Sequence, residues 1–250
     1  RGCNATQDGG ALFATRGARV ALVGAVVEAG GADSGGGAYL SESAELNATA
    51  GTVVRRCFAS VDGGALFVDT SSALVEDATL SGCQAQASGG AVFLSGSGAL
   101  VLRRSGLSGN RAELTGGALY MGRDARPSLQ QVTFTSNVAG DEGGAIYAVL
   151  NALAVGAGSS FTGNRALSGG AVFVQEADAE LADAVFVGNA ATQDGGALAV
   201  SGQARAGVRR AVRCARCTLR GNSATRGGAV AVSGDVRFEL RDSVVQDGSA

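Results

Sequence analysis

A glycine pair followed by alanine and an apolar residue recurs nine times along this chain of 250 residues. Successive pairs lie 26 or 27 residues apart, and only the last spacing, of 32 residues, is longer. Periods in this range are typical of repeats that stack on their neighbours into a solenoid, and they argue against separate globular domains. We therefore expect one elongated domain over residues 1–250. The pairs are Gly9-Gly10, Gly36-Gly37, Gly63-Gly64, Gly89-Gly90, Gly116-Gly117, Gly143-Gly144, Gly169-Gly170, Gly195-Gly196 and Gly227-Gly228.

Each repeat consists of short runs of strand-forming residues, without an amphipathic stretch of helical period. Leucine-rich repeats have a similar period, but the dense leucine ladder that they require is missing, and they have no use for a glycine pair in every repeat. The sequence therefore predicts an all-β fold, a parallel β-helix (β-solenoid) of about nine coils of 26–27 residues. Counted from six residues before most glycine pairs, the coils open at Cys3, Gly30, Cys57, Cys83, Asn110, Asn137, Asn164, Asn189 and Asn222.

The opening residue of each coil follows an apolar residue by three positions, as in FTSN at residues 134–137 and FTGN at residues 161–164. In the last five coils the opening residue is asparagine. Asparagine tolerates left-handed turns, and its amide can donate to the copy in one neighbouring coil and accept from the copy in the other, at a spacing of about 4.8 Å. Each such hydrogen bond contributes about 0.5–1.5 kcal/mol, so the row predicts a stabilising ladder.

Two rows of side chains follow the glycine pairs, which themselves predict a tight corner that a β-carbon would block. Because side chains alternate along a strand, the two rows lie on opposite faces. We expect the first row inside and the second outside, although stacked phenylalanines can also fill a core. The first row is Leu12, Tyr39, Leu66, Val92, Leu119, Ile146, Val172, Leu198 and Val230. The second row is Phe13, Leu40, Phe67, Phe93, Tyr120, Tyr147, Phe173, Ala199 and Ala231.

The composition limits the classes of function. All 20 basic residues are arginine, they stand against 22 acids, and histidine is absent. A near-neutral chain creates no overall field that favours nucleic acid. Without histidine or lysine the commonest general base, metal ligand and Schiff-base amine are missing, so we expect no catalytic, cofactor-binding or metal-binding residues. The longest apolar stretch, residues 20–27, is far short of the roughly 20 residues of a membrane span, and the missing initiator methionine suggests a fragment of a longer protein.

Two pairs of cysteines are placed to interact. Cys57 and Cys83 occupy the same slot in adjacent coils, where a disulfide is feasible, but stacked side chains point the same way and favour two buried thiols. Cys214 and Cys217 lie in the eighth coil, which is about six residues longer than the others. A zinc site would need two further ligands, so we expect a local disulfide if the protein is secreted, and free thiols if it is cytosolic.

Arginines gather in the same long coil, and between Gly195 and Gly234 there is no acid. The planar guanidinium suits carboxylate and sulfate groups, so this basic surface is a candidate contact for an acidic polysaccharide or a cell-surface protein. The plainer interpretation is a solvated surface that the preceding acids neutralise. The candidate residues are Arg205, Arg209, Arg210, Arg213, Arg216 and Arg220, with Arg226 nearby, and the preceding acids are Glu176, Asp178, Glu180 and Asp183. Calcium is another ligand that such alternating acids could bind.

The paired tetrapeptides GGA[ILV] and FxxN, at this spacing, resemble the repeat of the polymorphic outer membrane proteins of chlamydiae. The segments GGALF, GGAVF, GGALY and GGAIY, together with FTSN, FTGN and FVGN, carry the resemblance over nearly the whole chain. It implies a right-handed parallel β-helix displayed outside the cell, extracellular or at the outer membrane, that acts as an adhesin or a structural rod without a cofactor. The chain departs from the pattern at Cys3, Cys57 and Cys83, where cysteine replaces asparagine.

Three functions are compatible with these sequence features. The leading interpretation is a non-enzymatic surface or secreted rod or adhesin. Polysaccharide-degrading enzymes similar to pectate lyases and galacturonases share the fold, but their clusters of basic residues, acids and histidine have no counterpart in this sequence. A lectin-like module that binds sugar on the aromatic row is the third, and it requires those rings to point outward.

Overall fold

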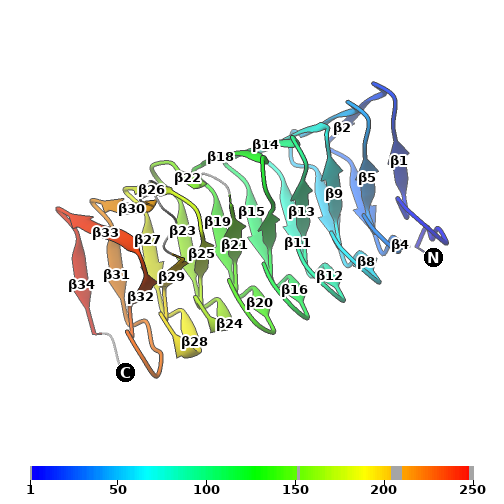
Figure 1. Ribbon diagram of the computed structural model, residues 1–250. Helices are drawn as coiled ribbons and strands as arrows, with labels where there is room; N and C mark the ends of the chain where they lie inside the picture. The colour runs from blue at the N-terminus through cyan, green and yellow to red at the C-terminus, as the bar shows by residue number, and fades with distance from the viewer. Residues whose placement is uncertain (1, 151–152, 204–209, 248–250) are drawn as a thin grey trace.

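The computed structural model describes residues 2–150, 153–203 and 210–247, and these residues form a stack of β-coils (Figure 1). Every ladder between its strands is parallel, and strands from successive coils lie side by side. The two chain ends lie at opposite ends of the stack (Figure 1). The all-β solenoid expected from the glycine spacing is confirmed.

Four parallel sheets run along the stack, three of nine strands and one of seven within the described residues. The first sheet contains β1 (Leu12–Ala14), β5 (Ala38–Leu40), β9 (Leu66–Asp69), β13 (Val92–Ser95), β17 (Leu119–Met121), β21 (Ile146–Val149), β25 (Val172–Gln175), β29 (Leu198–Gly202) and β32 (Val230–Gly234). The second contains β2 (Arg19–Val23), β6 (Glu45–Thr49), β10 (Ser72–Glu76), β14 (Ala99–Arg103), β18 (Arg126–Gln130), β22 (Leu153–Val155), β26 (Ala179–Ala182), β30 (Arg210–Ala215) and β33 (Val236–Arg241).

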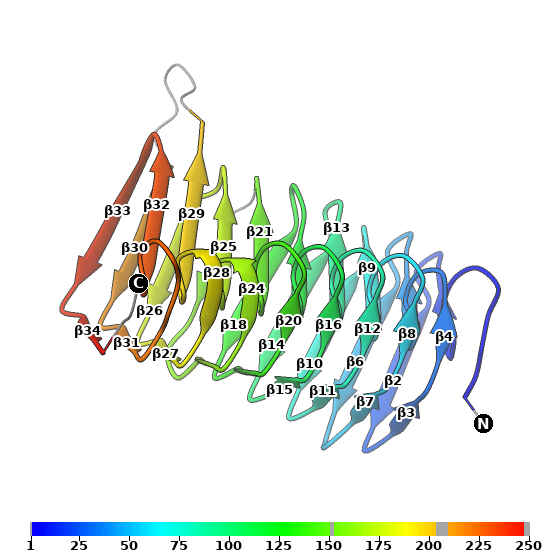
Figure 2. The same cartoon turned by 90° about the horizontal axis from the view of Figure 1, so that it is seen from below.

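The other two sheets are built from shorter strands, and Figure 2 shows the fourth in a row along one flank. The third contains β3 (Val26–Glu28), β7 (Val53–Arg55), β11 (Thr79–Ser81), β15 (Gly106–Ser108), β19 (Thr133–Thr135), β23 (Ser160–Thr162), β27 (Val185–Val187), β31 (Thr218–Arg220) and β34 (Val244–Gln246). The fourth contains β4 (Gly31–Ala32), β8 (Phe58–Ala59), β12 (Gln84–Ala85), β16 (Arg111–Ala112), β20 (Val138–Ala139), β24 (Arg165–Ser168) and β28 (Ala190–Asp194). The nine levels of the first sheet are separated by eight windings, which at about 4.8 Å each give a rod roughly 40 Å long.

A narrow core runs the length of the rod and is made of identical slots in successive coils. In β9 and β13 the burial pattern alternates, so that Leu66 and Val92 point inward and pair in register. The third sheet contributes the apolar residue of each FxxN segment, and Phe134, Phe161 and Phe186 are fully buried there with ring centroids 4.9 and 4.6 Å apart. Because equivalent apolar residues recur at a fixed spacing along the chain, their side chains stack into a continuous column.

The two glycines of each pair serve different needs. Gly143 has a φ of 68°, a left-handed conformation that side chains disfavour. Gly144 has no room for a side chain, because a β-carbon there would lie 2.1 Å from the carbonyl oxygen of Gly170 in the next coil. The corner is therefore closed to any other residue at both positions, as the sequence predicted.

The register of the second coil differs from the one expected. The left-handed glycine of this coil is Gly35, so the pair is Gly35-Gly36 and Gly37 fills the alanine slot. Leu12 then pairs with Ala38, and Phe13 pairs with Tyr39. The assignment of Tyr39 to the inner row and Leu40 to the outer row was therefore wrong, because three consecutive glycines made the pair ambiguous.

The asparagines form the predicted ladder. The Nδ2 of Asn137 donates to the Oδ1 of Asn164 at 3.0 Å and to the carbonyl of Leu107 at 3.0 Å. Its Oδ1 accepts from both the backbone N–H and the Nδ2 of Asn110, each at 3.0 Å. The left-handed residue, however, is the one before the asparagine, Ser136 in this coil with a φ of 54°. The asparagine therefore does not itself make the left-handed turn that this residue type tolerates.

The longer eighth coil does not disturb the columns. Asn189 still donates to the Oδ1 of Asn222 at 2.9 Å although the two are 33 residues apart. Leu198 pairs with Val230 in the first sheet in the same way.

No helix that could span a membrane by length and hydropathy occurs among the residues described.

Candidate functional site

An aromatic column follows the outer face of the first sheet. Its rings are stacked, with centroids of neighbours 4.5 to 5.7 Å apart and interplanar angles of at most 20°. This spacing matches the rise of the coils, because each ring comes from the same slot of successive strands. The members are Phe13, Tyr39, Phe67, Phe93, Tyr120, Tyr147 and Phe173.

The column lies outside the main core. Exposure falls along it, from 57 % for Phe13 through half-buried rings in the middle to 7 % for both Tyr147 and Phe173. The last two form a small apolar cluster with Ala199 that is separate from the core of the rod. The aliphatic-in, aromatic-out arrangement that the alternation favoured is therefore the observed one. The rings from Phe13 to Tyr120 are at least partly exposed and available for stacking contacts, whereas Tyr147 and Phe173 are buried.

Polar side chains border the aromatic column on the side that precedes the glycine corner. Burial raises the pKa of Asp62, against the opposing effect of the N–H that Ser88 donates to it at 2.8 Å. Burial, followed by the charge of Asp62, raises the pKa of Tyr120. Burial and the neighbouring Asp141 raise the pKa of Glu142. Carboxylates and rings therefore share one surface, where an apolar stripe meets hydrogen-bonding groups.

The aromatic column ends at a cavity. Phe173 pairs in register with Ala199, and Ala199 pairs with Ala231, so the two slots that continue the column hold only methyl groups. A cavity of about 580 Å³ opens there, and these three residues line it together with Asp194 and Arg226. Asp194 accepts from the guanidinium of Arg226 at 2.7 Å, so the rim of the cavity carries an ion pair.

The arginines of the basic surface lie on β30, on β31 and at the corner between them; Arg205 and Arg209 lie outside the described residues. The acids of the preceding coil face them. Arg213 lies 3.3 Å from Glu180, and Arg216 donates to both carboxylate oxygens of Asp183 at 2.6 and 2.7 Å. The hydrogen bonds from Arg216 lower the pKa of Asp183.

Two further arginines complete the described part of the basic surface. Arg210 lies 3.6 Å from Asp178, and Arg220 donates to the amide oxygen of Gln246 at 2.9 Å. Gln246 is neutral, and within the part of the chain that the structure describes Arg220 forms no ion pair, whereas the other three arginines have acidic partners. Of the alternating acids Glu176, Asp178 and Glu180 that were considered as calcium ligands, Asp178 and Glu180 thus face arginines. Among the described residues, no group of three or more cysteines or acids is arranged to hold a metal ion.

A hollow of about 580 Å³ lies on this surface, and Arg210, Arg213 and Arg237 line it together with Asp235. Three guanidinium groups at one hollow provide many hydrogen-bond donors in planar forks, which suit carboxylate or sulfate groups. Arg210 and Arg213 already pair with Asp178 and Glu180 of the preceding coil, so an acidic ligand would replace these ion pairs with its own.

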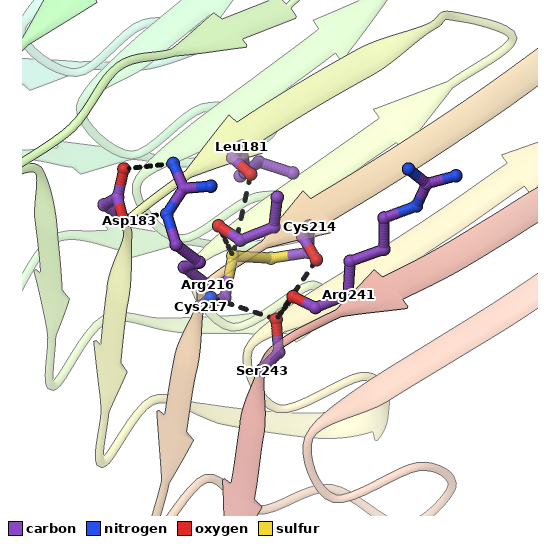
Figure 3. Close-up of a disulfide and its surroundings, with 8 residues drawn as sticks. Leu181, Asp183, Cys214, Arg216, Cys217, Arg241 and Ser243 are labelled. Atoms are coloured by element: carbon purple, nitrogen blue, oxygen red, sulfur yellow. Dashed lines mark hydrogen bonds and ion pairs between the residues drawn. A yellow bond between two sulfur atoms is a disulfide. The ribbon is translucent and has the colours of Figure 1, made fainter.

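Cys214 and Cys217 are joined by a disulfide, with their Cα atoms 5.8 Å apart (Figure 3). Both cysteines are buried, and the bridge spans the corner from β30 to β31. Cys214 takes a core slot that leucine fills in the neighbouring coils, at Leu181 and Leu240. The hydroxyl of Ser243 accepts the N–H of Cys217 at 3.0 Å.

Cys57 and Cys83 remain thiols, both buried, and Cys3 is an exposed thiol. The backbone N–H of Cys83 donates to the Oδ1 of Asn110 at 3.0 Å, so the cysteine occupies the asparagine column and continues part of its bonding. Contact between the two side chains lowers the pKa of Cys57 and raises that of Cys83. The prediction that Cys57 and Cys83 are buried thiols in the ladder, without a disulfide between them, is confirmed.

The cavity at the end of the aromatic column was not anticipated from the sequence. Its signal was present, because the outer row changes from aromatic residues to Ala199 and Ala231 after Phe173. Arg226, which seemed to belong to the basic surface, lies instead on the rim of this cavity, since the fold places the glycine corner on a different flank from β30.

Comparison with protein families finds one match. Residues 131–149 match the Chlamydia polymorphic membrane protein (Chlamydia_PMP) repeat. This segment contains one FxxN tetrapeptide and one GGA[ILV] tetrapeptide, FTSN at residues 134–137 and GGAI at residues 143–146. No curated protein and no solved structure matches the chain. The chain is therefore a β-solenoid with a repeat of the polymorphic membrane protein type.

Proposed function

We propose that this protein is a non-enzymatic β-helix rod, secreted or displayed at a cell surface, that acts as an adhesin. The observation that carries the proposal is the column of stacked, partly exposed rings along the outer face of the first sheet. Apolar stripes that meet water and are rimmed by polar groups are typical of interaction surfaces. The matched repeat supports display outside the cell.

The architecture suits adhesion because it holds contact groups rigidly. Apart from Phe13 on the end strand β1, each ring of the aromatic column is fixed by a strand that pairs on both sides, for example β13 between β9 and β17. A partner therefore meets a surface that is already ordered, and binding loses little side-chain entropy. A structural rod is the other role within the same class, and it would use the length of the stack without using the outer face.

We also propose that the basic surface contributes a contact for acidic groups, as in an acidic polysaccharide or an acidic face of a cell-surface protein. The proposed residues are Arg205, Arg209, Arg210, Arg213, Arg216 and Arg220. Within the described part, the hollow between Arg210, Arg213 and Arg237 supports this role, as does the uncompensated charge of Arg220. Asp183 holds Arg216 in a bidentate pair, so we expect Arg216 to contribute least.

Binding of the purified chain to a panel of immobilised polysaccharides and to intact cells tests the adhesin proposal. We expect saturable binding, and a loss of about tenfold in affinity for sulfated or uronate polymers in the variant Arg210→Gln/Arg213→Gln, with Arg19→Gln at the other end of the rod as the matched control. If neither the wild type nor the control variant binds to cells, the adhesin proposal is contradicted. Release of reducing ends or unsaturated products from any polysaccharide would contradict a non-enzymatic role.

Display outside the cell has its own test. Antibody against the chain should label intact cells of the producing organism or detect the chain in the medium, and external protease should remove the label. A signal that appears only after the cells are lysed would contradict secretion and surface display.

A further inference from the structure

The aromatic column ends before the rod does. The first sheet continues through β29 and β32, but Ala199 and Ala231 stand where the pattern would place two more rings. Phe173 is therefore the last ring of the stack, with an aromatic neighbour, Tyr147, on one side. On the other side lies the cavity of about 580 Å³ that Phe173 helps to line.

We propose that this cavity binds a hexopyranose ring of a neutral glycan, beyond the buried Phe173 and Ala199 and against the partly exposed Ala231. The proposal rests on the adhesin function and names the ligand class at one place on the aromatic surface. The cavity falls within the range of about 300–1,000 Å³ that is typical of ligand pockets.

The lining of the cavity favours a sugar over an aromatic side chain of a protein partner. Half of the lining residues are polar, with Ser201 and Ser233 from β29 and β32 and with Gln193, Asp194 and Arg226 from the glycine corner side. Sugar hydroxyls both donate and accept, so they can bond to the carboxylate and the guanidinium at once. An aromatic side chain would desolvate the same groups and offer nothing in return.

The charges at the cavity favour a neutral sugar. Glu142 and Asp194 both line it, against the single cation Arg226. Arg226 already donates to Asp194 at 2.7 Å. The carboxylate of a uronate or sialic acid would add a third negative charge beside these two acids, whereas uncharged hydroxyls add none.

The test is a titration of the whole chain with methyl glycosides of glucose, galactose, mannose and N-acetylglucosamine, followed by NMR. We expect at least one of them to bind with a dissociation constant on the order of 1 mM, as suits a ligand of this size. The variant Ala199→Phe supplies the missing ring and fills the slot, so we expect it to weaken binding at least tenfold. Phe58→Ala, which removes an exposed ring on β8 outside the aromatic column, is the control and should bind as the wild type does.

Two more variants keep the test decisive if Ala199→Phe does not fold. Asp194→Asn keeps the size of the side chain and Arg226→Gln keeps a polar one. Each should weaken binding of the same glycoside at least threefold, while far-UV circular dichroism stays unchanged. The proposal is overturned if no glycoside binds, if Ala199→Phe binds as well as the wild type, or if N-acetyl-phenylalanine amide binds and the glycosides do not. If no glycoside binds to the wild type while the wild type still adheres to cells, the cavity proposal fails and the adhesin proposal stands.

Discussion

At the scale of single residues, the rod depends on polar groups that are buried and fully bonded. Asn137 is the centre of this pattern, with both amide protons and both lone pairs of Oδ1 in use and the side chain fully buried. An unpaired polar group in such a position costs about 1–3 kcal/mol. The hydrogen bonds of the asparagine column therefore each add little stability, but the loss of one asparagine would leave buried polar groups of its neighbours without a partner.

We predict that Asn137→Ala lowers the free energy of unfolding by about 3 kcal/mol, because the Nδ2 and the backbone N–H of Asn110 lose their acceptor. Urea denaturation followed by circular dichroism measures the change. Asn47→Ala, at an exposed position of β6, is the control and should stay within about 0.5 kcal/mol of the wild type. Equal stability of the two variants would show that the ladder contributes nothing.

Asp62 gives a prediction for pH dependence. Burial raises its pKa in the folded state, so the charged carboxylate destabilises the rod once the pH exceeds the ordinary carboxyl value, and the loss is complete above the raised pKa. We expect Asp62→Asn to be more stable than the wild type at pH 7 and equal to it at pH 3, in urea titrations at both values. The amide can still accept the N–H of Ser88.

Asp77 provides the opposite sign as a control. The hydrogen bonds from Arg104 lower the pKa of Asp77, so its contribution is present above the ordinary carboxyl pKa and is lost as the pH falls through the lowered one. Asp77→Asn should therefore be no more stable than the wild type at pH 7. A gain in stability at pH 7 for both variants would indicate a general effect of net charge instead of local burial.

At the scale of elements, the sequence predicted what repeats and missed what departs from the repeat. The inward ladder, the glycine corner and the asparagine column follow from identical residues at identical spacing. The register of β5 could not be read, because Gly35, Gly36 and Gly37 offer two equivalent pairs and only the contact between coils decides. The left-handed residue before each asparagine was missed because several residue types occupy it.

The candidate site was predictable in part for the same reason. Alternation along the strands placed the aromatic column outside, since the opposite face was filled by aliphatic residues. The cavity required knowing that Arg226 and Asp194 meet beside Ala199, which depends on how the corner folds over the first sheet. For the basic surface, the acids one coil earlier were visible in the sequence, and their pairing partners followed only from the register of β26 with β30.

The disulfide at the corner from β30 to β31 gives a prediction at this scale. Closing so short a loop contributes about 2 kcal/mol through the entropy of the unfolded chain. We expect equilibrium urea denaturation in dithiothreitol to show this loss for the wild type. The variant Cys214→Leu/Cys217→Ala, which copies the residues of the preceding coil, should show no effect of reductant. Sensitivity of that variant to dithiothreitol would assign the effect to something other than this bridge.

At the scale of the whole molecule, each coil contacts only its neighbours, so stability is approximately a sum of coil and interface contributions. We predict that deletion of residues 117–143, one full period, leaves a folded rod that is shorter by about 5 Å. Gly116 would then precede Gly144, and the Asn110 slot would face Asn164. The slope of unfolding against urea should fall by about one ninth, because it scales with the surface exposed. Small-angle scattering and urea titration measure both quantities.

Deletion of residues 117–129, about half a period, is the control. It would bring strands of different sheets into the same level and mix inward with outward positions, so we expect an unfolded or aggregated product. If both deletions behaved alike, the stacking of equivalent slots would not be what holds the rod together.

The corner between β29 and β30 accommodates more residues than its counterparts, yet the strands on both sides keep their partners. Length at this corner is therefore decoupled from the geometry of the scaffold. A foreign peptide could be grafted at the equivalent corner between β13 and β14, after Gly96, and the graft would be carried on the flank of the rod. Such a scaffold could acquire new specificities by insertion, one coil at a time, while its interior stayed unchanged.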